Sequence, residues 1–446
     1  MMKKLLLLTL ACAVVPAESA FAADLLQVYR DALDYDAQYA SARAARDAGQ
    51  EKLPQGRAGL LPVISASANT TWNDIDFNSR RTGTPPVDVR YNTNGYTLTL
   101  TQPVFRWQNI EQYGQSKLQV VATDAQFAQA RQDLILRVSQ AYFDALLAQD
   151  SLNLAQAQKK AIAEQLEAAK RNFEVGTATI TDTHEAQARY DLATAQELAA
   201  QNDLEIKRQA LRQVIGKVPD SLASLRAQVQ LQRPQPDDMT KWVEAAEAGS
   251  PLVQAQEAAL EIADKEINKQ RAGHLPTLDL VATRGRSSAT GSLALGTPAA
   301  GSDTHSNTIG LQLTLPIFAG GAVMSKDREA VALREKARAD LDNTRRSAAL
   351  NARQAYLGVT SGMAQVKAYE QALISSQSAL DSNKLGYEVG VRINIDVLNA
   401  QQQLFSTRRD LAKARYDTLV AQLRLKAAAG SLGEDDVQAI NALLEK

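Results

Sequence analysis

FEVGTATITD, residues 173–182, is followed 214 residues later by YEVGVRINID, residues 387–396. Each segment comes after a long stretch without proline, and in each a glycine, Gly176 or Gly390, precedes an aspartate by six positions. Glycine commonly follows the C-terminus of a helix, and aspartate is favoured at the N-terminus, where it caps free N–H groups. The two segments therefore predict two tight turns, each joining a long helix to a returning helix.

The same displacement extends along the whole chain and identifies an internal repeat. Matching positions include Asp24 and Asp238, Arg57-Ala58-Gly59 and Arg271-Ala272-Gly273, Pro62 and Pro276, Ala141-Tyr142 and Ala355-Tyr356, and Gly216 and Gly430. Gln102-Pro103-Val104-Phe105 and Leu315-Pro316-Ile317-Phe318 are displaced by 213 residues instead. We expect repeat 1 at residues 23–216 and repeat 2 at residues 238–430, with connecting segments at 217–237 and 431–446.

Each repeat is predicted to contain a strand pair, a very long helix and a returning helix. The expected strand pairs lie at about 62–101 and 276–315, the long helices at about 108–172 and 320–386, and the returning helices at about 182–215 and 396–429. A further helix is expected at about 25–56. In the strands, Tyr96, Leu98 and Leu100 alternate with threonines, which is typical of a sheet with one apolar and one polar face. The polar stretches 73–90 and 287–306 are predicted to be exposed loops.

The long helices carry a coiled-coil pattern. The first would have about 65 residues and a length near 100 Å at 1.5 Å per residue. Mostly apolar and small residues recur at alternating spacings of three and four from Ile135 to Phe173, and a similar register runs from Tyr356 to Tyr387. A heptad pattern of this length predicts a left-handed supercoil with a neighbouring helix.

Residues 1–22 have the order of an export signal: Lys3 and Lys4, an apolar run, and Ala20-Phe21-Ala22 as the cleavage site. No later segment has the roughly 20 apolar residues that a membrane helix needs. Four strands cannot close a barrel, and an open sheet edge in lipid would leave backbone groups without partners. If the strands enter a membrane, two or three copies of the chain must therefore share one barrel.

Composition and motifs argue against several other functions. The formal net charge of −1 gives no sign of nucleic-acid binding. The three histidines, at positions 184, 274 and 305, fall in separate regions, and Cys12, the only cysteine, lies within the predicted signal. The chain has no nucleophile elbow, phosphate-binding loop or zinc-protease motif. We therefore predict no enzyme, no cofactor and no metal site.

The repeat, the strand ends Gln-Pro-Val-Phe and Leu-Pro-Ile-Phe, and the two turn segments resemble the TolC family of outer-membrane efflux and secretion channels. The resemblance covers essentially the whole mature chain. It implies a mainly α protein with β-strands: a homotrimer with a 12-stranded β-barrel, four strands per chain, continuing into a long coiled-coil α-helical barrel across the periplasm. It also implies mixed equatorial segments at 217–237 and 431–446, and partnership with a periplasmic adaptor and an inner-membrane ABC or RND-type transporter.

The resemblance further assigns roles to individual residues. Thr181 and Asp182 on one turn would link to Tyr387 and Arg392 on the other and close the periplasmic tip. Asp396 would belong to a carboxylate ring at the entrance aperture, but the family's second aspartate is replaced by Asn399, which predicts weaker cation selectivity. The turns Val175-Gly176-Thr177 and Val389-Gly390-Val391 would dock the adaptor. The alternative for Asp182 and Asp396 is ordinary helix capping, and for the two glycines it is a C-terminal helix cap.

The predicted function is thus an outer-membrane channel-tunnel that exports proteins, small molecules or both. The alternative is an exported coiled-coil adaptor or scaffold without a pore. An adaptor carries one hairpin flanked by β-rich domains, whereas this chain has two hairpins and two strand pairs, which favours the channel.

Overall fold

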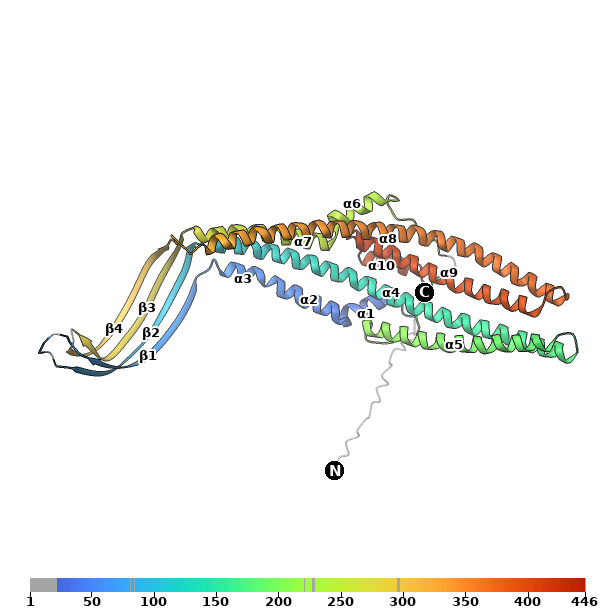
Figure 1. The fold of residues 1–446 in the computed structure, drawn as a ribbon, viewed down its shortest axis with the longest axis horizontal. Coiled ribbons are helices and arrows are strands. Elements are labelled where there is room, and N and C mark those ends of the chain that lie inside the picture. The colour runs from blue at the N-terminus through green and yellow to red at the C-terminus, as the bar shows by residue number, and fades with distance from the viewer. Residues whose placement is uncertain are drawn as a thin grey trace, which may run out of the picture.

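The computed structural model describes residues 22–80, 82–83, 85–219, 221–226, 229–294 and 297–445. The predicted export signal, with Cys12, lies outside the described residues except for its last position. The molecule is elongated, with a sheet at one end and long helices that run from it to the opposite end (Figure 1). Both predicted hairpin turns lie at the end away from the sheet (Figure 1).

Two long helical hairpins dominate the fold. The outer hairpin consists of α4 (Trp107–Glu174) and α5 (Ile180–Ile215), and the inner hairpin of α8 (Ala322–Glu388) and α9 (Asn394–Ala428). In the half nearer the sheet, α2 (Ala37–Gln50) and α3 (Lys52–Ala58) pack on α4, whereas α7 (Pro251–Arg271) packs on both α4 and α8. The remaining helices are α1 (Leu25–Tyr35), α6 (Met239–Gly249), the short 3-10 helix η1 (Ala272–His274) and α10 (Glu434–Asn441). No helix of the described part of the chain is long and apolar enough to cross a bilayer.

The first helix of repeat 1 is not continuous, contrary to the prediction of one helix at about 25–56. It breaks at Asp36, which leaves the helical conformation and caps α2 by accepting a hydrogen bond from the Tyr39 N–H at 2.6 Å. The same carboxylate, almost fully buried, forms an ion pair with Arg137 of α4 at 2.8 Å. A side chain that satisfies backbone donors and a charged partner together favours the break over a continued helix.

The four strands form one antiparallel sheet in the order β1-β2-β3-β4. They are β1 (Val63–Phe77), β2 (Val87–Phe105), β3 (Thr277–Ala294) and β4 (Thr297–Thr314), so β2 and β3 join the two repeats. The loop predicted at 73–90 is shorter than expected, because β1 reaches Phe77 and β2 begins at Val87. The loop predicted at 287–306 is wrong, because β3 and β4 occupy its described residues. The β1–β2 ladder reaches Phe77 and Val87, and cross-strand polar pairs such as Arg90 with Asp74 accompany the extension.

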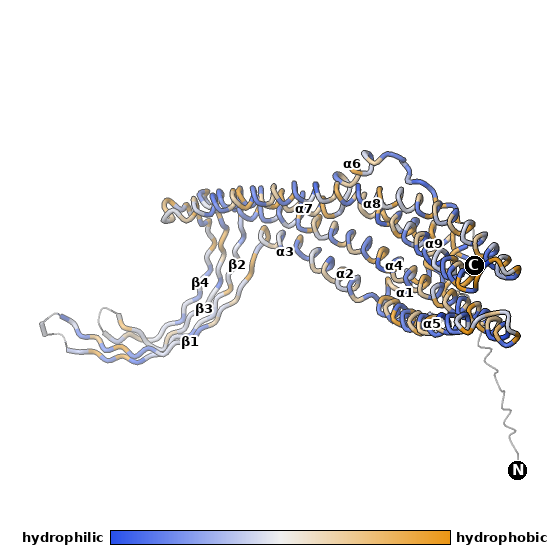
Figure 2. The backbone as a smooth tube through the Cα atoms, turned by 45° about the vertical axis from the view of Figure 1, so that its right-hand side comes forward, coloured by the Kyte–Doolittle hydropathy of each residue, from blue (hydrophilic) through white to orange (hydrophobic). Residues whose placement is uncertain are grey.

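The register gives the sheet two different faces. Residues in register point to the same side of a sheet, and successive residues alternate. Hydrophobic and hydrophilic residues alternate along the strands (Figure 2). One face therefore carries a polar set of serine, threonine, asparagine, glutamine and glycine in most positions. The other, which we call the apolar face, carries Ile64, Ala66, Tyr96, Leu98, Leu100, Leu278, Leu280, Ala282, Ile309, Leu311 and Leu313. Many of these side chains are exposed in the single chain.

The largest core lies midway along the helices, where α1, α4, α9 and α10 meet the end of α5. Tyr142 and Phe143 of α4 are fully buried there, and the Phe143 ring stacks on Tyr416 of α9 at 5.5 Å. The Tyr142 hydroxyl donates a hydrogen bond to the Ala223 carbonyl at 2.8 Å, and burial raises the pKa of this tyrosine above its usual value. The segments after α5 and after α9 both contribute to this core, which fixes the two hairpins relative to each other.

Candidate functional site

The outer tip, residues 173–182, is a tight turn stabilised by its own backbone. Gly176 has φ +77°, the left-handed conformation that glycine adopts without steric cost. The Thr177 N–H donates to the Asn172 carbonyl at 2.8 Å, which closes the end of α4. Thr179 and Asp182 form a capping box at the start of α5: the Asp182 carboxylate accepts from the Thr179 N–H at 3.0 Å and from its hydroxyl at 2.8 Å. Asp182 therefore has the capping role that the sequence left open.

The inner tip, residues 387–396, repeats this geometry with different side chains. Gly390 also has φ +77°, and the Val391 N–H donates to the Gly386 carbonyl at 2.8 Å. Arg392 lies over Gly386, where an added Cβ would meet the arginine side chain at 2.7 Å. Its guanidinium is 3.6 Å from the Asp396 carboxylate, in the first turn of α9. Arg392 and Asp396 are thus brought together within the inner tip.

Within one chain, the predicted links between the tips take a different form. Among the described residues, Tyr387 forms no hydrogen bond with Asp182 or Thr181 but accepts one from the Asn172 amide at 3.1 Å. Thr181 is exposed. The hydrogen bond from Asp182 to the inner hairpin uses its backbone, since the Asp182 carbonyl accepts from the Asn394 amide at 3.4 Å.

Asn394 is the residue that sequence reasoning missed. It is the first residue of α9 and is fully buried. Its side-chain oxygen accepts a hydrogen bond from Gln165 of α4 at 2.5 Å, so one amide joins α4, α5 and α9. Buried polar groups are stable only when they are hydrogen-bonded, and both ends of this amide have partners. The sequence offers one sign of this role, which is the difference between the repeats: Asn394 matches the apolar Ile180 of repeat 1.

Asn399 and Arg189 form a second polar contact between the hairpins. The Arg189 guanidinium donates to the Asn399 side-chain oxygen at 2.9 Å and to that of Gln402 at 2.6 Å. Asn399 is exposed, whereas Asp396 is partly buried. Any charge introduced at position 399 would therefore lie beside an existing cation.

A third polar contact lies further from the tip, between α4 and α9. The Tyr416 hydroxyl donates to the Asp150 carboxylate at 2.7 Å. Burial raises the pKa of Asp150, while the tyrosine hydrogen bond acts in the opposite direction. From the tip to the central core, the contact between the hairpins thus includes single polar pairs among small apolar clusters such as Ile162, Leu166, Ala169, Ala186, Ala193 and Leu398.

The two turns themselves are exposed and apolar. Val175, Val389 and Val391 are 73%, 65% and 79% exposed, and no atom lies within 4 Å of a Cβ built on Gly176 or Gly390. These valines are therefore uncovered apolar side chains at the two turns of the single chain.

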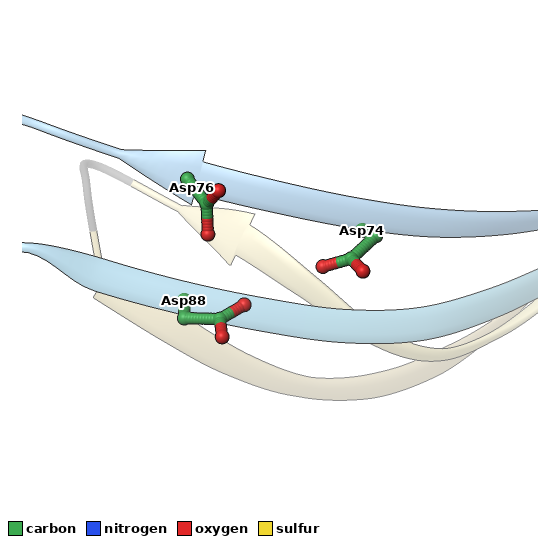
Figure 3. A group of neighbouring side chains, drawn as sticks. All are labelled: Asp74, Asp76 and Asp88. Atoms are coloured by element: carbon green, nitrogen blue, oxygen red, sulfur yellow. The ribbon is translucent and has the colours of Figure 1, made fainter.

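A cluster of three carboxylates, Asp74 and Asp76 of β1 and Asp88 of β2, lies near the far end of the sheet (Figure 3). It is the one group in the described ranges whose carboxylates or histidines come close enough to hold a metal ion. All three side chains are exposed, and Arg90 pairs with Asp74 at 3.2 Å. This neutralisation and exposure are typical of a solvated strand end, and we assign no metal to it.

Comparison with known proteins gives two kinds of match. The family model described as outer membrane efflux protein matches residues 28–217 and 242–431. The chain is 35% identical to the alkaline protease secretion protein AprF of Pseudomonas aeruginosa, over 95% of this chain and 88% of the relative. It is 34% identical to the outer membrane protein TolC of Escherichia coli, over 100% of this chain and 90% of the relative.

Solved structures have the same fold. The outer membrane protein VceC of Vibrio cholerae matches with a TM-score of 0.76 at 20% identity, covering 91% of this chain and 96% of that one. The CmeC outer membrane channel of Campylobacter jejuni matches with a TM-score of 0.78 at 19% identity, covering 94% and 89%. Together with the sequence matches, these show that the chain belongs to the outer membrane efflux protein family and is an outer-membrane export channel.

Proposed function

We propose that three copies of the chain form one channel-tunnel: a 12-stranded barrel in the outer membrane that continues into an α-helical barrel in the periplasm. The observation that carries this proposal is the sheet, which has an apolar and a polar face but ends in the unpaired edges of β1 and β4. In lipid, each unpaired backbone group costs several kcal/mol, so the edges must pair with other copies. The apolar face then contacts lipid and the polar face lines the lumen.

Three copies suit an open channel better than two. An eight-stranded barrel has an interior filled by side chains, whereas a larger barrel leaves a lumen. The matched family segments are displaced by the same 214 residues as the sequence repeat, which supports two equivalent hairpins per copy and six around the tunnel. Native mass spectrometry of the detergent-solubilised protein, combined with conductance in planar bilayers, tests both parts. A monomer without conductance would contradict the proposal.

The hairpin tips form the proposed gate. Asp182, Thr181, Tyr387 and Arg392 are each exposed or partly exposed in the single chain, so they remain available for links between copies. Exposed polar links contribute about 0–1 kcal/mol each, so three symmetric sets give a latch of a few kcal/mol. We expect Asp182→Ala combined with Arg392→Ser to raise single-channel conductance. Unchanged conductance would remove these residues from the gate.

The exposed turns at Val175-Gly176-Thr177 and Val389-Gly390-Val391 are the proposed docking points for a periplasmic adaptor, which would join the channel to an inner-membrane ABC or RND-type transporter. Relatives named for protease secretion support protein export as one activity, and a relative named an outer membrane efflux protein supports efflux as another. The family assignment favours the channel over the coiled-coil scaffold. Co-purification with the native transporter would identify the cargo class, and its loss on Gly176→Asp with Gly390→Asp would locate the docking points.

A further inference from the structure

The apolar face has aromatic residues at both of its limits on β2. Tyr96 lies at one limit, in register with Arg286, and Phe105 lies at the other, in register with Leu278 beyond a bulge. The stretch between them spans about 30 Å along the strand at about 3.3 Å per residue. With the strand tilt of about 40° typical of membrane barrels, this corresponds to roughly 23 Å, near the height of a lipid-facing band bounded by aromatic girdles.

Basic side chains lie at the Tyr96 end of the apolar face, which is the end away from the helices. Arg286 is flanked in register by Tyr96 and His305, and Arg284 by Leu98 and Asn307. Both arginines therefore lie on the apolar face. Since the helices leave the sheet at the Phe105 end, this limit is at the outer leaflet in the proposed barrel (Figure 1).

The two arginines differ in their partners. Arg286 forms an ion pair with Asp303 at 3.2 Å, and both side chains are about half exposed. Arg284 is exposed and has no ion pair or hydrogen bond with any residue that the structure describes. The patch of Arg284, Arg286 and His305 with Asp303 thus keeps an excess of positive charge.

A cation on a lipid-facing surface needs an anion nearby. Arginine in this position costs up to about 2–4 kcal/mol at the bilayer centre and about 0–1 kcal/mol near the interface, where its long side chain reaches the headgroups. The guanidinium fork also matches phosphate oxygens, with two parallel hydrogen bonds. The position of Arg284, just inside the aromatic limit, therefore suits a phosphate attached to an acyl chain.

We propose that Arg284, with Arg286 and His305, binds the phosphate groups of a phosphorylated glycolipid, the lipid A of lipopolysaccharide, in the outer leaflet. Acyl chains would lie along Leu98 and Ile309, while the phosphates contact the basic side chains. The inference rests on the proposed barrel, since only this assigns the apolar face to lipid. It gives each subunit one lipid site on its outer surface.

Native mass spectrometry of the solubilised full-length protein tests the proposal by titration with bis-phosphorylated lipid A and, separately, with dephosphorylated lipid A and phosphatidylglycerol. We expect the wild type to bind the bis-phosphorylated form at least tenfold more tightly than either other lipid. Arg284→Gln with Arg286→Gln should remove this preference. The control is Arg90→Gln, which makes the same kind of substitution and removes one positive charge from the same face. It lies about 20 Å from Tyr96 along β2 at about 3.3 Å per residue, where Asp74 already neutralises it.

Each outcome decides the question. Equal binding of the phosphorylated and dephosphorylated lipids by the wild type overturns the site, and this comparison needs no variant to fold. Phosphatidylglycerol bound as tightly as lipid A means general anion attraction and overturns the assignment to lipid A. Equal losses in the double variant and in Arg90→Gln also overturn it. The same spectra give the subunit number, so a trimer without the preference contradicts only the lipid site, whereas a monomer contradicts the proposed barrel.

Discussion

Replacing the buried amide of Asn394 should loosen the contact between the hairpins at the tip. In Asn394→Leu, a side chain with the same branching and number of heavy atoms replaces the amide, so apolar contact with α4 and α5 is kept while both hydrogen bonds are lost. A net hydrogen bond contributes about 1 kcal/mol, and the contact to the Asp182 carbonyl is long at 3.4 Å. Because Gln165 is only partly buried, its freed amide can be hydrated. We therefore expect a loss of about 1–2 kcal/mol per subunit, or about tenfold in the equilibrium between linked and separated hairpins.

Single-channel recording in planar bilayers measures this effect. If three subunits separate together, the per-subunit losses add to about 3–6 kcal/mol, enough to convert a mostly closed tip to a mostly open one. The control is Asn153→Leu, the same substitution at an exposed position of α4, where the one hydrogen bond of the amide within the described part of the chain is with Gln149. Gln165→Leu should have a similar effect, and the double variant should add little to either single one. Wild-type conductance in Asn394→Leu, with oligomers intact, would refute this account of Asn394.

Three further predictions follow from other contacts. Arg106→Gln should destabilise the junction of sheet and helices by about 2–4 kcal/mol, because the almost fully buried Asp279 carboxylate loses its two hydrogen bonds from the Arg106 guanidinium, at 2.6 and 2.8 Å. The dissociation temperature of the oligomer measures this loss, and Arg80→Gln, at an exposed position, is the control. Tyr416→Phe should raise the pKa of Asp150 further, because the carboxylate loses the hydrogen bond that favours its ionised form. A carboxyl group whose pKa is raised by folding destabilises the folded protein while it is ionised, and this cost disappears as pH falls through that pKa. The variant should therefore gain more thermal stability than wild type on acidification from pH 7 towards the ordinary pKa of 3.8. Asn399→Asp alone should have little effect on channel block by multivalent cations, because Arg189 would neutralise the new carboxylate. Asn399→Asp combined with Arg189→Gln should strengthen the block. No change in the double variant would mean that position 399 does not face the entrance.

Long-period patterns in the sequence predicted the large features of the fold. Helix starts and ends near the tips were well marked, because Gly176 and Gly390 require a left-handed conformation and the following residues favour a new helix. Alternation from Tyr96 to Thr101 predicted the two faces of the sheet, since a period of two has only one structural meaning in an extended chain.

Features that depend on distant partners were not predictable. The strands extend beyond the expected limits, into residues 73–77, 87–90, 287–294 and 297–306, in part because polar side chains such as Arg90 and Asp74 pair across them. Composition alone predicts a loop for such polar residues. The break at Asp36 depends on Arg137, and the burial of Asn394 depends on Gln165. In each case a local sequence window contains only one of the two groups whose contact decides the structure.

The distribution of buried side chains along the hairpins explains how a tip can move while the molecule stays folded. Near the centre, the buried aromatic residues Tyr29, Tyr142 and Phe143 pack with segments from both repeats, and the loss of such a side chain costs several kcal/mol. At the tips, the buried cluster is smaller and rich in alanine, and the hairpins are joined by single polar pairs that each contribute about 1 kcal/mol. Local stability therefore falls from centre to tip, and segments that move are expected at the low end. The proposed gate lies where separating the hairpins exposes less apolar surface than it would at the central core.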